Sequence, residues 1–235
     1  MIISVTEEMR RKMTKDGSVL KYLRNTGGMN KGCFAGGIFL VIAAAVLGVS
    51  FKSIPIVGLF FGGIFGIPGV LMLLMGFIFQ KKKVNGYLSF YQKESGYGAE
   101  EIKRIDQELL ASDVICISTM PAGTALKDLQ VGCFITRNYL VMPSPLGKSY
   151  IRRLEDVMAA IYCKTIPGIG GYKQGLVFVS KQDDELYYNA NFTISSCNEV
   201  IQALHDRNPQ IITDQFYERN GVQFDLLKDW RTLNS

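Results

Sequence analysis

"CFAGGIFLVIAAAVLGVSF", residues 33–51, and "IPIVGLFFGGIFGIPGVLMLLMGFIF", residues 54–79, are separated only by Lys52 and Ser53. Neither run contains a charged residue. At 1.5 Å per residue, each run would form a helix of roughly 28 Å or more, which is enough to cross the core of a bilayer. The short connection therefore predicts a two-helix transmembrane hairpin over residues 33–83, with both ends of the chain on the same side of the membrane.

The charges on either side of these runs predict an orientation. Up to residue 83 the chain has eleven Lys and Arg residues against three Asp and Glu, whereas the rest has fifteen against eighteen. Lys and Arg are enriched in the cytoplasmic loops of membrane proteins. We therefore expect a multi-pass protein of the cell membrane with both termini in the cytoplasm. Residues 1–32 form a basic segment that could contain a helix lying on the anionic inner leaflet.

Glycines recur at four-residue spacing in the second run, at Gly58, Gly62 and Gly66. Such glycines let helices approach closely, either within the hairpin or between two copies of it. The first arrangement is the preferred interpretation, and a homo-oligomer formed through the glycine-rich runs is the alternative. Pro68 is expected to bend or break the second helix. A small oligomeric transporter or pore component stays as a second hypothesis, although the runs offer no ionisable group for an ion pathway.

The chain after the lysines changes its periodicity from helical to strand-like. Residues 84–112 carry apolar residues at helical spacing and predict juxtamembrane helices. Short runs bounded by turn residues then predict seven strands, over residues 114–120, 129–136, 139–144, 149–154, 157–165, 176–181 and 185–192. A helix starting at Ser195 or Ser196 and ending before Pro209 would follow them. This order predicts an α+β membrane protein, in which a PH-like antiparallel β-barrel is capped by a C-terminal helix.

Three segments in this region carry a resemblance to a known family. They are "GCFITRNYLVMPSPLGKSYIRRLEDVMAAIYCK" (132–164), "GLVFVSKQDDELYYNANF" (175–192) and "CNEVIQALHDRNPQII" (197–212). Residues 113–213 resemble the bacterial PH-like domains of uncharacterised small membrane proteins that also have two transmembrane helices. The resemblance implies a tethered interaction module and carries no catalytic residues with it. Residues 214–235 would be a C-terminal tail.

Basic residues supply the candidate binding site. Such a set would face anionic lipid or an acidic protein partner, although a solvated strand face is the preferred interpretation of the later members. The candidates are Lys81, Lys82, Lys83, Lys148, Arg152, Arg153, Lys164 and Lys173. The negative balance after residue 83 argues against nucleic acid as a partner.

The sequence contains no recognisable set of catalytic or metal-binding residues. His205 is the only histidine, and the five cysteines show no paired metal-ligand spacing. We therefore expect no catalysis, no cofactor and no metal. The sequence predicts a membrane-anchored interaction module that binds a protein partner or anionic lipid.

Overall fold

A computed structural model of the chain describes residues 2–3, 7–15, 17–26, 31–50, 55–118, 131–143, 149–166, 174–190 and 192–234. The chain forms two compact units: Leu20–Leu88 is one, and Met1–Val19 together with Ser89–Ser235 is the other. The helices are α1 (Glu7–Thr14), α2 (Val19–Thr26), α3 (Lys31–Ser50), α4 (Pro55–Asn85), α5 (Tyr87–Ser95), α6 (Ala99–Glu108), α7 (Ile194–Arg207), α8 (Leu226–Asp229) and the 3-10 helix η1 (Trp230–Asn234). The strands are β1 (Ile2–Ile3), β2 (Ile115–Ser118), β3 (Val131–Ile135), β4 (Tyr139–Met142), β5 (Tyr150–Arg153), β6 (Val157–Cys163), β7 (Gly175–Ser180), β8 (Tyr187–Asn189), β9 (Phe216–Arg219) and β10 (Val222–Asp225).

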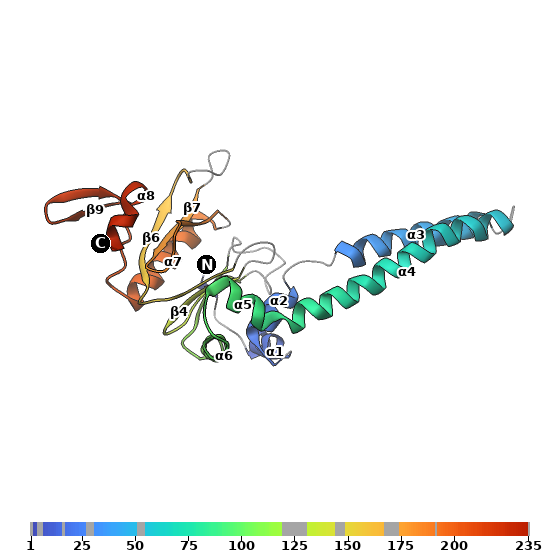
Figure 1. Cartoon of the computed structure of the whole chain (residues 1–235), viewed down its shortest axis with the longest axis horizontal. Coiled ribbons are helices and arrows are strands. Elements are labelled where there is room, and N and C mark those ends of the chain that lie inside the picture. Colours follow the sequence, from blue (N-terminus) through green and yellow to red (C-terminus); the bar gives the residue numbers. More distant parts are fainter. Residues whose placement is uncertain are drawn as a thin grey trace. The chain divides into compact units, whose positions relative to one another are not determined.

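In the first unit, α3 and α4 pack along each other as a hairpin (Figure 1). Glycines bring the two backbones together, since a Cβ atom placed on Gly36 would lie 2.8 Å from the carbonyl oxygen of Gly69. A Cβ atom on Gly66 would lie 3.8 Å from the Cβ of Ala43 in α3. Gly66 therefore faces the other helix of its own hairpin. Pro68 does not end α4, which continues to Asn85.

The membrane assignment made from the sequence is wrong. Over the parts of its helices that the structure describes, none combines the length and the apolar character needed to span a bilayer. The uncharged runs at 33–51 and 54–79 contribute to the helices α3 and α4, and their length and lack of charge were the basis of the prediction. The predicted transmembrane hairpin and the multi-pass location in the cell membrane are corrected accordingly.

The second unit is built on two antiparallel sheets. One has the order β1-β2-β3-β4-β5 and the other the order β6-β7-β8. Each strand predicted between residues 114 and 192 has a counterpart among β2 to β8. The short strand β1 was not predicted; it adds to the sheet by pairing Ile2 with Ile117 and Ile3 with Cys116.

The predicted closed barrel is also wrong. Among the described strands, β5 and β6 follow each other in the chain but belong to separate sheets. β1 occupies the outer edge of β2, and closure of a barrel would need such an edge for pairing with another strand. The architecture is mixed α+β with two open sheets.

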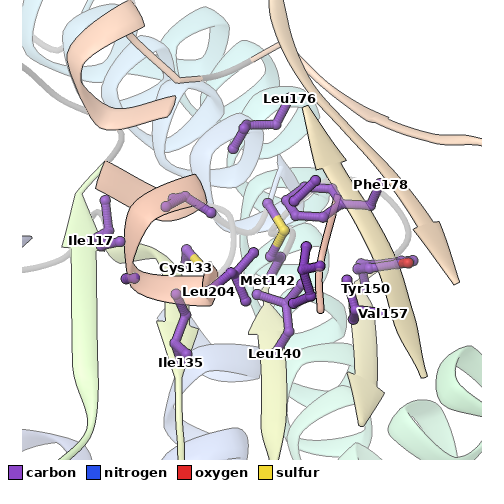
Figure 2. Packing of buried hydrophobic residues seen from close by; sticks show 14 of the residues in the cluster. Ile117, Cys133, Ile135, Leu140, Met142, Tyr150, Val157, Leu176, Phe178 and Leu204 are labelled. Carbon is purple, nitrogen blue, oxygen red and sulfur yellow. The ribbon is translucent and has the colours of Figure 1, made fainter. Parts of the chain in front are cut away.

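A hydrophobic core joins the two sheets and α7. Figure 2 shows side chains from both sheets converging on Leu204 of α7. Phe178 of β7, Leu140 of β4 and Leu204 are fully buried in this cluster. The helix begins at Thr193, whose side chain accepts a hydrogen bond from the backbone N–H of Ser196. The predicted capping helix is thus present, and its cap lies slightly before the predicted Ser195 or Ser196.

The C-terminal residues form a small structure of their own. β9 and β10 make a hairpin around Asn220 and Gly221, which both have a positive φ angle (54° and 75°). Asn-Gly is the sequence that such tight turns favour. Leu226 and Trp230 then pack against β6 and β7 in a second buried cluster. The lone tryptophan thus completes a core.

Candidate interaction surface

The structure describes the side chains of three members of the predicted basic set, Arg152, Arg153 and Lys164. Lys81, Lys82 and Lys83 lie in the last turns of α4, where only the backbone is described. Lys148 and Lys173 lie outside the described residues. Lys164 is exposed just after β6, while Arg152 and Arg153 end β5.

Arg152 is paired inside the protein. Its guanidinium hydrogen-bonds and forms an ion pair with the carboxylate of Asp183, in the turn that follows β7. The two side chains are only 13% and 8% exposed. The Tyr150 hydroxyl donates a hydrogen bond of 2.7 Å to the same carboxylate. Burial, together with the charge of Asp183, raises the pKa of Tyr150 well above its usual value, so this hydroxyl keeps its proton and serves as a donor.

Arg153 is partly exposed and is also paired with a carboxylate of its own unit. It makes two hydrogen bonds with Glu101 of α6, from Nε at 2.7 Å and from a terminal guanidinium nitrogen at 2.8 Å. The Tyr139 hydroxyl donates to the same carboxylate at 3.1 Å. The hydrogen bond from Arg153 lowers the pKa of Glu101. Such a bidentate pair fixes the planar guanidinium in one orientation.

The far end of α6 is held by a further carboxylate. Glu108 accepts hydrogen bonds from the Thr136 hydroxyl at 2.7 Å and from the Asn138 side chain at 2.6 Å. Thr136 and Asn138 form the turn between β3 and β4. Glu101 and Glu108 therefore attach the two ends of α6 to the five-stranded sheet. In this arrangement Arg152 and Arg153 stabilise the fold, and their charges are already matched by carboxylates.

His205 and two of the buried cysteines have no activating partner among the described residues. Nδ1 of His205 is buried and makes no hydrogen bond to the described residues. Burial raises the pKa of Cys116 to about 12 and that of Cys197 to about 11. Both thiols therefore stay protonated and are poor nucleophiles at neutral pH. Within the described residues, no group of His, Cys, Asp or Glu side chains could hold a metal ion.

The most distinctive exposed feature is a row of large apolar side chains along α4, which we call the α4 row. Its members are between 47% and 65% exposed: Phe60, Ile64, Ile67, Leu71, Leu74 and Ile78. They recur at alternating spacings of four and three residues, the pattern of a coiled-coil seam. The spacing is present in the sequence, but it does not stand out there because most of the neighbouring residues are also apolar.

The α4 row lies on the side of α4 that faces away from α3. Its positions are two, five and nine residues before and after Gly69, which contacts α3 through Phe39 and Leu40. At about 100° per residue, such positions lie roughly half a turn from Gly69. Three more exposed apolar side chains flank the row on α4, namely Val70, Met72 and Met75. A contiguous apolar surface thus remains after α3 and α4 have packed together.

Comparison of the chain with protein-family models, curated proteins and solved structures gave no match.

Proposed function

We propose that this chain is a non-catalytic interaction protein that binds a protein partner through the α4 row. The observation that carries the proposal is the exposure of six large apolar side chains at coiled-coil spacing on one face of α4. Apolar patches of more than a few hundred Å² are uncommon on isolated proteins and mark sites of interaction. The seam spacing favours a helix as the contacting element of the partner.

The second unit supports a binding role rather than an enzymatic one. Its carboxylates at Glu101, Glu108 and Asp183 are used to hold α6, β5 and neighbouring turns in place. Its buried thiols at Cys116 and Cys197 have raised pKa values because of desolvation. General acid–base and nucleophilic catalysis both need such groups next to an activating partner.

The same contacts disfavour anionic lipid as the ligand of the predicted basic set. Arg152 and Arg153 already pair with Asp183 and Glu101. Arg152 is largely buried, and releasing it toward a lipid headgroup would leave the Asp183 carboxylate without its counter-charge, which is strongly destabilising. An apolar partner for the α4 row needs no such rearrangement.

Photo-crosslinking in the cells that make the full chain tests the proposal. A benzophenone amino acid is placed at Ile67 in the α4 row and, as a control, at Glu155, whose side chain is 72% exposed in the second unit. We expect discrete protein adducts from position 67, at least ten times weaker adducts from position 155, and loss of the former in the Leu71→Glu variant. Because Leu71 is exposed, its replacement leaves the packing of α3 on α4 intact. Adducts that resist this substitution, or the absence of protein adducts at position 67, would contradict the proposal.

A further inference from the structure

We infer that the α4 row binds the α4 row of a second copy of this chain, with the two helices antiparallel. The inference builds on the proposed function, because it names the partner of the surface described above. Three properties of the row carry it: the symmetry of its spacing, the area it offers, and the distribution of charge around it.

The spacing of the row is the same in both directions. Counted from either end, its members are separated by four, three, four, three and four residues. Two antiparallel copies would therefore meet in register, with Phe60 opposite Ile78, Ile64 opposite Leu74 and Ile67 opposite Leu71. Each contact would occur twice about a two-fold axis that crosses the α4 row at the level of Gly69, as an isologous interface requires.

The area of the row suits a dimer. At roughly 100 Å² of exposed apolar surface for each large side chain, the six members and the three flanking side chains offer on the order of 900 Å². A standard stable interface buries about 800 Å² on each partner. The six members together with the three flanking side chains thus provide enough surface for a specific pair, without any contribution from the second unit.

The charges select an apolar partner and an antiparallel arrangement. The chain has no charged residue from position 55 to position 80, and three consecutive lysines follow at 81–83. An acidic or basic partner would find no opposite charge along the row. In a parallel pair the two lysine clusters would meet and repel each other, whereas an antiparallel pair places them at opposite ends of the interface.

Crosslinking between two differently tagged full-length chains tests this inference. One chain carries Ile64→Cys and the other Leu74→Cys, and both carry Cys33→Ser. The cysteines of the second unit are buried, so chains without the new cysteines give the background level of crosslinking. With a short bismaleimide, we expect the 64–74 product to exceed the 64–64 and 74–74 products at least ten-fold. Ile67→Glu should reduce the 64–74 product more than ten-fold, whereas Ile38→Glu, at an exposed position of α3, should not.

Each other outcome contradicts the inference in a recognisable way. Predominant 64–64 and 74–74 products would mean a parallel pair. Monomeric chains that float with phosphatidylcholine vesicles, and lose this binding on Ile67→Glu, would mean that lipid covers the row. If the 64–74 product is absent while a benzophenone at position 67 still captures a different protein, the self-association is wrong and the proposed function stands. If neither assay yields a protein contact, both are wrong.

Discussion

Arg152 and Asp183 form a largely buried ion pair that ties the last strand of the five-stranded sheet to the turn after β7 in the three-stranded sheet. Tyr150 donates to the same carboxylate and stacks on Tyr187 of β8, with ring centroids 4.1 Å apart. Asp183 thus connects the two sheets through Arg152 and Tyr150, whereas no backbone pairing joins β5 to β6.

Removal of the Asp183 charge should destabilise the second unit. In Asp183→Asn the Arg152 guanidinium stays buried without its counter-charge, so we expect a loss of about 3 kcal/mol in the free energy of unfolding. Urea titration followed by the fluorescence of Trp230 measures it. Asp184→Asn changes an exposed acid in the same turn and should cost less than about 0.5 kcal/mol. Equal effects of the two substitutions would show that the ion pair does not support the fold.

The pair of Glu101 and Arg153 should make stability depend on pH. Because Arg153 lowers the pKa of Glu101 in the folded state, the unfolded state binds this proton more tightly. The stabilisation is present above the ordinary glutamate pKa of about 4.3 and is lost as pH falls through the lower folded value. We expect Glu101→Gln to lower the urea midpoint at pH 7 and to weaken its decline below about pH 5. Glu100→Gln, at a side chain that is 87% exposed, is the matched control and should leave the profile unchanged.

Local patterns in the sequence identified much of the second unit. Alternation and turn residues identified the strands from β2 to β8, and apolar spacing identified α6 and α7. Two parts were missed for different reasons. β1 is only two residues long, too short for a periodicity, and the hairpin at Asn220-Gly221 was overlooked although this dipeptide is a known turn signal.

The arrangement of the elements in space could not be predicted from short stretches of sequence. The prediction of a closed barrel was wrong because strand order depends on which edges pair. The edge of β2 is paired with β1, a strand at the N-terminus. Arg152 and Arg153 resembled a surface patch because their carboxylate partners are distant in sequence, at Asp183 and Glu101. In the hairpin, α4 carries no charged residue from position 55 to position 80. Charge therefore could not distinguish the face that packs on α3 at Gly69 from the opposite face that carries the α4 row.

Gly175 should tolerate no side chain. A Cβ atom at this position would lie 2.3 Å from the carbonyl oxygen of Asn189, across the pairing of β7 with β8. Gly175→Ala must therefore push the strands apart, and we expect a loss of about 2 to 3 kcal/mol in stability together with faster hydrogen exchange in β7. Gly98→Ser is the control, since a Cβ atom there meets nothing within 4 Å and serine favours the N-cap position of α6. A Gly175→Ala variant as stable as the control would contradict the close approach.

Gly36 should be required for the packing of α3 on α4. An added Cβ atom would lie 2.8 Å from the carbonyl oxygen of Gly69, so Gly36→Ala forces the helices apart even though alanine raises helix propensity by about 1 kcal/mol. We expect faster amide hydrogen exchange across α3, measured on the full chain by mass spectrometry. The adjacent Gly37→Ala receives the same gain in propensity, and its Cβ atom meets nothing within 4 Å, so exchange should stay equal or become slower. The comparison separates backbone contact from helix propensity: slower exchange in both variants would mean that the two helices do not pack through Gly36 and Gly69.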